Sequence, residues 1–186
     1  FLTADDYSLI ERNSTKVESC IDPNGVFKGM VRVKQQWFDE TTELGKLIRS
    51  KLNQIELLRD NRIDGMQVAD MLKPYDIHGD YLVQKNQKPI SDPSIHNPMY
   101  TIIIPLVDGE YHTVVFDQEA DYNNFSEYKE KNNELVDYVS NEDWQKYCGH
   151  CHDVDQKYLT IKKVLHWRKG SLLALNRKLM HASANF

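Results

Sequence analysis

The sequence has few cysteines, no excess of positive charge and no long apolar run. Its three cysteines argue against a disulfide framework and fit a reducing compartment. Acidic residues outnumber basic ones by 28 to 23, and the formal net charge of -5 gives no general basis for binding nucleic acid or anionic membranes. The longest apolar run, around residues 100–107, is too short to span a bilayer, and no charged-then-apolar leader is present. We therefore expect a cytoplasmic protein without a membrane partner.

The overall composition is that of an ordinary globular protein. Apolar residues make up 40% and charged residues 27% of the 186 positions, which is enough apolar material for one domain with a sizeable core. The chain contains no internal repeat and no low-complexity segment. The composition thus predicts a single domain over residues 1–186.

Short strands dominate the hydrophobic pattern, with one clear helix near the start. Apolar residues recur at three- and four-residue steps between residues 40 and 58, which predicts an amphipathic helix on the outside of a sheet. Alternating or consecutive apolar residues predict strands at 26–33, 100–106, 112–116 and 159–167. Another strand region begins over residues 66–72 and runs into the segment of His78. The turn signal Asp108-Gly109 makes residues 100–116 a predicted hairpin. Gly170 opens a second hairpin, whose second strand begins at His181. Many short strands joined by hairpins indicate a sandwich or barrel.

A long polar segment, residues 117–160, interrupts the strand pattern. Acidic, Asn, Lys and Tyr residues dominate it, and residues 127–138 have the pattern of a helix. An insert of this length between two core strands is compatible with a lid over an active site and equally with a passive surface addition. If it is a lid, it should cover the mouth of the barrel and help to select the substrate.

Two distant segments supply a possible metal site. In an extended strand alternate side chains share a face, so His78 and Asp80 of His78-Gly79-Asp80 should project together. His181 begins the last short strand. Two imidazoles and one carboxylate on one side of an ion form the facial triad of non-haem Fe(II) sites, which leaves the remaining coordination positions open. The pattern predicts that His78, Asp80 and His181 hold iron.

Four further segments accompany this tripeptide. The set consists of residues 78–80, 100–106, 112–116, 170–173 and 181–186. Together they resemble the Fe(II)/2-oxoglutarate-dependent oxygenase superfamily, with a closing pattern similar to its phytanoyl-CoA-dioxygenase-like and prolyl-hydroxylase-like members. The resemblance covers roughly residues 64–186.

The resemblance implies both a fold and a reaction. The fold is a mainly β, double-stranded β-helix (jelly-roll) core over residues 64–186, with residues 1–63 as an N-terminal flank carrying the helix and 117–160 as the insert. The cofactor is Fe(II), the co-substrates are 2-oxoglutarate and O2, and the products include succinate and CO2. A small-molecule or peptide substrate is hydroxylated, or demethylated through a hydroxymethyl group.

The resemblance also suggests which residues contact 2-oxoglutarate. A buried distal carboxylate needs a charged partner, and Arg is the natural one. Arg177 is the nearest, although it lies in a polar turn; Ser183 shares the face of His181, and Tyr100 opens a matching strand. Because other members place the anchor beyond the second histidine, we expect the native protein to continue past Phe186 into a strand with an Arg or Lys.

Two other interpretations stay open from the sequence. The run Cys148-Gly149-His150-Cys151-His152-Asp153 is a fair half-site for structural zinc, with Cys20 and His166 as the remaining candidate ligands. Alternatively, the chain is a jelly-roll binding module without turnover. Zinc content distinguishes the first of these from an oxygenase, and succinate release distinguishes the second.

Overall fold

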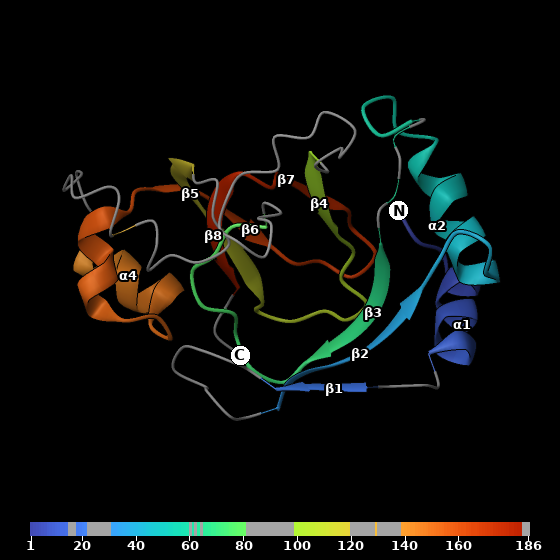
Figure 1. The fold of residues 1–186 in the computed structure, drawn as a ribbon, viewed down its shortest axis with the longest axis horizontal. Coiled ribbons are helices and arrows are strands. Elements are labelled where there is room, and N and C mark those ends of the chain that lie inside the picture. The colour runs from blue at the N-terminus through green and yellow to red at the C-terminus, as the bar shows by residue number, and fades with distance from the viewer. Residues whose placement is uncertain are drawn as a thin grey trace, which may run out of the picture. The chain divides into compact units, whose positions relative to one another are not determined.

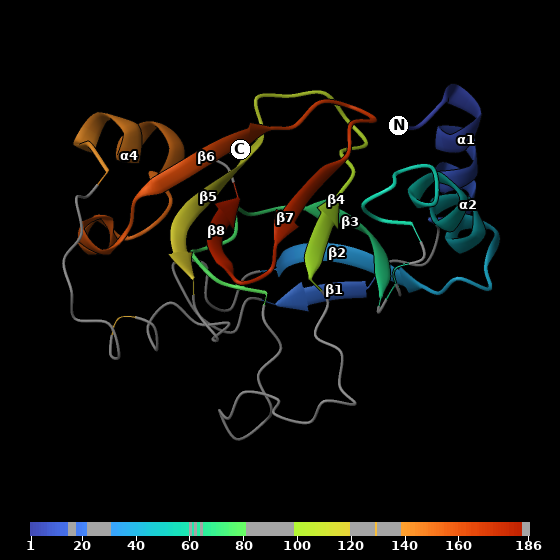
Figure 2. The same ribbon diagram turned by 90° about the horizontal axis from the view of Figure 1, so that it is seen from above.

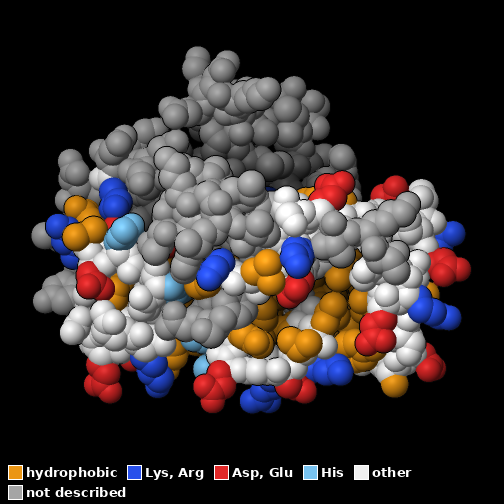
Figure 3. Space-filling model, turned by 90° about the horizontal axis from the view of Figure 1, so that it is seen from below, with side chains coloured by type: hydrophobic (Ala, Val, Ile, Leu, Met, Phe, Trp, Pro, Cys, Tyr) orange, Lys and Arg blue, Asp and Glu red, His pale blue; other side chains and the backbone are white. Residues whose placement is uncertain are grey.

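The computed structural model describes residues 1–14, 18–21, 31–59, 61, 63, 65–80, 99–119, 129 and 139–183 (Figure 1). The chain divides into two compact units, Phe1–Lys73 and Pro74–Phe186, and each is considered by itself. Charged side chains of both signs are interspersed over the face drawn in Figure 3, in keeping with the small net charge. Among the described helices, none has the length and apolarity needed to cross a membrane.

The first unit contains two helices and a three-stranded antiparallel sheet in the order β1-β2-β3. Its elements are α1 (Ala4–Asn13), β1 (Glu18–Ile21), β2 (Val31–Phe38), α2 (Glu43–Leu52) and β3 (Met66–Met71). Of the strand predicted over residues 26–33, residues 31–33 belong to β2, and residues 26–30 lie outside the described residues. β3 pairs with β2 in this unit, whereas we predicted that residues 66–72 would begin the jelly-roll core.

Helix α1 was not predicted, although its start carries a local signal. Thr3 accepts a hydrogen bond from the Asp6 amide, and the Asp6 carboxylate accepts one from the Thr3 amide at 2.6 Å. This reciprocal arrangement is a capping box, with Asp in the place of the usual Glu or Gln. Asp6 also pairs with Lys51 of α2 at 2.7 Å, so one carboxylate both caps α1 and joins the two helices.

Helix α2 is the predicted amphipathic helix, but it is shorter than predicted. It ends at Leu52, and turns continue to Arg59. Its N-cap is Thr42, whose hydroxyl accepts a hydrogen bond from the Gly45 amide at 3.0 Å. The backbone of Asp39 packs so closely against Gly45 that a Cβ at this position would lie 1.9 Å from the Asp39 carbonyl oxygen. The first turn of α2 therefore requires glycine at this position.

The second unit contains two separate antiparallel sheets. β5 (His112–Glu119) lies between β6 (Ile161–His166) and β8 (Leu179–Ser183), and β4 (Tyr100–Ile103) pairs with β7 (Leu173–Asn176), as Figure 2 shows. The short helices α4 (Asn141–Cys148) and η1 (Asp153–Tyr158) belong to the same unit. Gly170 has φ 70°, a left-handed conformation that favours glycine, and it forms the predicted turn before β7.

Both predicted hairpins are wrong in their pairing. β4 and β5 are consecutive in the chain, yet β4 pairs with β7 and β5 pairs with β6 and β8. β7 and β8 follow each other across a tight turn, yet they also belong to different sheets. The connection from Ile104 to Tyr111 is too long for a tight hairpin turn. The Ile102 region is only half-buried, because β4 lies in a two-stranded sheet and not between two buried faces.

The core of the second unit lies on one face of the β6-β5-β8 sheet. Strand β5 contributes Val114 and Phe116, and β8 contributes Met180 and Ala182, all with 0% exposure. The insert supplies the other side of this core, with Trp144, Cys148, Cys151 and Leu159. The described part of the insert, residues 139–160, is thus structural and largely helical. The helix predicted over 127–138 lies outside the described residues except for Lys129.

The fold is therefore mixed and somewhat β-rich, with three small antiparallel sheets. The described strands of these sheets do not close into a jelly roll.

Candidate metal centre

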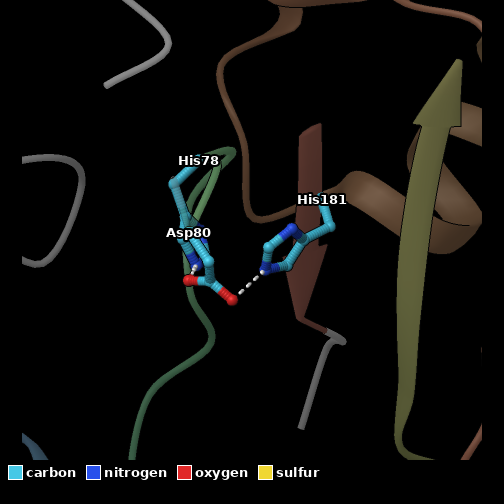
Figure 4. Close-up of side chains that lie close together, drawn as sticks. All are labelled: His78, Asp80 and His181. Carbon is cyan, nitrogen blue, oxygen red and sulfur yellow. Dashed lines mark ion pairs between the residues drawn. The ribbon is translucent and has the colours of Figure 1, made fainter. Parts of the chain in front are cut away.

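A backbone bridge brings together the two distant histidines. The His78 amide donates to the His181 carbonyl at 3.0 Å, and the His181 amide donates to the His78 carbonyl at 2.8 Å. Residues 77–80 therefore run antiparallel beside β8, on the opposite side of β8 from β5. This bridge places the centroids of the two imidazole rings 4.4 Å apart, and Figure 4 shows the Asp80 carboxylate directed at both rings.

The three side chains converge as the sequence predicts. His78 Nε2 lies 3.7 Å from Asp80 Oδ1, and His181 Nε2 lies 3.5 Å from Asp80 Oδ2. One ligand atom from each residue lies within 4.8 Å of the other two, and no other His, Cys, Asp or Glu set in the described part of the chain meets this criterion. Ligand atoms about 2.1 Å from one ion and at right angles are about 3.0 Å apart, so a small contraction would complete the coordination. The triad can bind a metal.

The hydrogen bonds at the far side of each ring favour metal binding through Nε2. His78 Nδ1 lies 2.6 Å from the Asp76 carbonyl oxygen, and His181 Nδ1 lies 3.0 Å from the Leu179 carbonyl oxygen. A carbonyl only accepts, so each Nδ1 donates its proton to that carbonyl, and Nε2 is the ring nitrogen left to bind an ion. Such bonds to the second nitrogen are the usual means of orienting metal-binding imidazoles.

Asp80 is fixed by two further residues, Thr101 and Arg177. Sequence reasoning missed Thr101 and expected Arg177 to contact 2-oxoglutarate. The Thr101 hydroxyl donates to Asp80 Oδ2. The Arg177 guanidinium donates through Nε, at 2.8 Å, and through Nη2 to the Asp80 carbonyl oxygen, while the Asp80 amide donates to the Arg177 carbonyl at 3.2 Å. No local signal marks Thr101, because its partner is 21 positions away and the strand pairing had been predicted wrongly.

The carboxylate is held in its ionised form. Burial alone would raise the pKa of Asp80, but the hydrogen bond and charge of His181, the charge of His78 and the Thr101 hydroxyl together lower it well below the usual range. The His181 side chain is only 7% exposed, while those of His78 and Asp80 are each 25% exposed. The site is therefore closed on the side of His181 and accessible on the side of His78 and Asp80, as an ion that binds further ligands requires.

The three residues predicted to contact 2-oxoglutarate have different surroundings. Ser183 shares the face of His181, since they pair with Thr113 and Val115 of β5, and its hydroxyl accepts a 2.6 Å hydrogen bond from the Tyr75 amide. Arg177 is engaged with the Asp80 main chain. Tyr100 precedes Thr101 in β4, so alternation directs it to the face opposite Asp80. The contacts of all three with 2-oxoglutarate stay predictions.

The described residues 139–160 of the insert pack on the face of the sheet opposite His181. Residues opposite each other in antiparallel strands point to the same side, so His181 shares its face with Val115. Met180 and Ala182 point to the other side, and that is where α4 and η1 pack. Within residues 139–160, the expectation that the insert covers the metal is therefore wrong.

The alternative zinc site is not assembled in the described residues. Cys148 and Cys151 are buried in the hydrophobic core, and burial raises the pKa of the Cys148 thiol to about 12. Burial, followed by the nearby Cys148 and acidic groups, also raises the pKa of Cys151. His150 Nε2 instead lies 3.0 Å from the Tyr75 carbonyl oxygen. These cysteines behave as small apolar core residues.

Comparison with known proteins adds no family assignment. No family model matches the chain, and no curated protein and no solved structure matches it.

Proposed function

We propose that the protein is an Fe(II)- and 2-oxoglutarate-dependent dioxygenase that hydroxylates or demethylates a small-molecule or peptide substrate. The observation that carries the proposal is the convergence of ligand atoms from two imidazoles and one carboxylate, with both Nδ1 atoms held by backbone carbonyls. Two imidazoles and one carboxylate with open positions favour non-haem Fe(II). A structural zinc site would normally be closed by a fourth protein ligand, and no fourth ligand accompanies the triad in the described residues.

The strand arrangement supports the jelly-roll part of this proposal. The segment at His78, β5, β6 and β8 belong to one sheet, while β4 and β7 belong to another. The chain thus passes repeatedly from one sheet to the other between consecutive strands. Such passages between two sheets are expected in a double-sheet jelly roll, where distant segments become neighbours.

Each residue of the centre would have a defined part in catalysis. Bound Fe(II) would supply the oxidative decarboxylation of 2-oxoglutarate by O2, to succinate and CO2, coupled to oxidation of a substrate C–H bond. His78 and His181 would hold the ion through Nε2, and Asp80 would offset part of its charge. Asp76 and Leu179 keep the ring protons on Nδ1 through their carbonyls, so the rings keep their orientation when the ion binds.

Lys163 is our candidate partner for the distal carboxylate of 2-oxoglutarate. It pairs with Val115, which pairs with His181 on the other side, so all three side chains rise from the same face. Lys163 and His181 are two strands apart, about 10 Å between their Cα atoms, which a lysine and a dicarboxylate can bridge together. The neighbouring Lys162 is instead paired with Asp117 at 3.2 Å.

An anaerobic titration tests the main proposal. Adding 2-oxoglutarate to the Fe(II)-loaded chain should produce a weak visible charge-transfer band, and admitting O2 should release succinate. His181→Ala should give neither signal. Wild-type protein that binds Fe(II) but yields no band and no succinate would contradict the proposed function.

A pair of lysine variants tests the anchor. Lys163→Ala should raise the dissociation constant of 2-oxoglutarate without changing that of the metal, whereas Lys162→Ala should change neither. The two lysines are neighbours with the same net charge effect, so long-range electrostatics cancels in the comparison. Equal effects of both variants would show that Lys163 makes no specific contact.

A further inference from the structure

Asp80 is the residue of the centre that could bind an ion in two ways. A carboxylate can bind an ion through one oxygen or through both. A six-coordinate ion with one atom from each triad residue keeps about three open positions, but a two-oxygen Asp80 would remove one of them. The proposed chemistry uses two positions for 2-oxoglutarate and one for O2. The binding mode of Asp80 therefore decides whether the reactants fit.

The two oxygens of Asp80 have different partners. Oδ2 accepts the proton of the Thr101 hydroxyl and lies 3.5 Å from His181 Nε2, whereas Oδ1 lies 3.7 Å from His78 Nε2. Thr101 is β-branched and lies in β4, so its χ1 rotation is restricted and the direction of its hydroxyl is set by the strand. Its pairing with Leu175, which is 4% exposed, fixes the position of that strand segment.

The main chain of Asp80 is held separately. Arg177 donates two hydrogen bonds to the Asp80 carbonyl oxygen and accepts one from the Asp80 amide. These contacts prevent the peptide on either side of Asp80 from turning. The remaining freedom of the carboxylate is rotation about its own side-chain bonds. Among the described side chains that face it, the Thr101 hydroxyl makes the shortest contact, and the two imidazoles lie 3.5 and 3.7 Å away.

We propose that Thr101 is a positioning residue that keeps Asp80 a one-oxygen ligand and thereby preserves an open coordination position. This inference rests on the proposed function, because it presumes an ion bound by the triad. The Thr101 proton engages one lone pair of Oδ2 and fixes the direction of the carboxylate, so a bound ion would bond to one oxygen and not to both. Without the hydroxyl, both oxygens become available to the same ion.

The test counts water molecules on bound Mn(II), an oxygen-stable probe of the site. Line broadening of the Mn(II) electron paramagnetic resonance spectrum in ¹⁷O-enriched water reports the number of coordinated waters. Wild-type protein should retain about three, and Thr101→Val, which has nearly the same shape without the hydroxyl, should retain one fewer. Thr101→Ser restores the hydroxyl and should restore the third water. Circular dichroism checks folding, and Thr101→Ala replaces the valine variant if that variant does not fold.

The outcomes separate this inference from the function on which it rests. Wild-type protein with no affinity for Mn(II) overturns both. Wild-type protein that binds Mn(II), with a hydroxyl-free variant that keeps the same number of waters, overturns only the role of Thr101. A folded hydroxyl-free variant that binds no Mn(II) also overturns it, since the hydroxyl would then be needed for affinity and not for the one-oxygen mode.

Discussion

Metal binding should stabilise the second unit against heat, and truncation of one triad histidine should remove this effect. We choose His181→Ala as the perturbation, because His181 is the most buried ligand and belongs to β8 in the three-stranded sheet. The truncation also removes packing, so the melting temperature of the metal-free variant will already be lower than that of wild type. The informative quantity is the change that Mn(II) causes within each protein.

The size of the change follows from linkage between binding and folding. At free Mn(II) 100 times the dissociation constant, binding stabilises the native state by about 2.7 kcal/mol. For a unit of the size of Pro74–Phe186, about 4 °C per kcal/mol gives a rise of about 10 °C. If loss of one ligand weakens binding about 100-fold, the same Mn(II) concentration contributes about 0.4 kcal/mol and about 2 °C.

Differential scanning fluorimetry with and without Mn(II) measures these shifts. The matched control is His152→Ala, which removes an exposed histidine from the same unit and from the cysteine–histidine run considered for zinc. It should keep the full rise of about 10 °C. If His181→Ala keeps the wild-type rise, or His152→Ala loses it, then the ion is not bound by the triad and the reasoning is refuted.

Three other predictions concern proton competition and packing. Mn(II) affinity should fall as pH decreases from 7 to about 5, because imidazoles must lose a proton to bind. The lowered pKa of Asp80 keeps that carboxylate ionised over this range, so the contribution of Asp80 to Mn(II) affinity is lost only below its ordinary pKa of 3.8. Isothermal titration calorimetry at several pH values measures the proton release. Gly45→Ala should lower the melting temperature of the first unit, whereas Gly65→Ala, whose Cβ would meet only the Trp37 side chain, at 3.1 Å, should cost less. Trp144→Ala should reduce the free energy of unfolding by about 3–5 kcal/mol in urea denaturation, while sparing the triad geometry; a normal stability for this variant would show that the insert is not part of the core.

The metal ligands were predictable because they depend on local chemistry. Alternation in an extended segment is enough to predict His78 and Asp80 on one side, and His78 forms an isolated antiparallel bridge with His181. His181 was predicted as the third ligand from residue type and from the resemblance, and it converges with them. The helix at residues 43–52 was likewise visible in its apolar spacing.

Strand pairing was not predictable in the same way. Turn signals such as Asp108-Gly109 mark where the chain bends, but they do not state which strand becomes the neighbour. The apolar residues of β4 and β5 are compatible with a hairpin and with pairing across sheets, and long-range packing decides between them. Helix α1 was missed because its polar composition hides a periodicity that buries only Asp6 and Ile10. The support of Asp80 by Thr101 and Arg177 depends on the same long-range pairing.

The register of β8 connects the core to the metal centre. Side chains alternate between faces, so a slip of one residue would bury His181 among the insert residues and turn Met180 or Ala182 toward the ion. Both of those residues have 0% exposure and pack against Val114 and Phe116, so such a slip would expose a well-filled core face. The cost of that exposure keeps His181 opposite His78, where the bridge of two hydrogen bonds can form. The insert therefore contributes to the site from the far side of the sheet, because the core that it completes fixes which face of β8 carries the histidine.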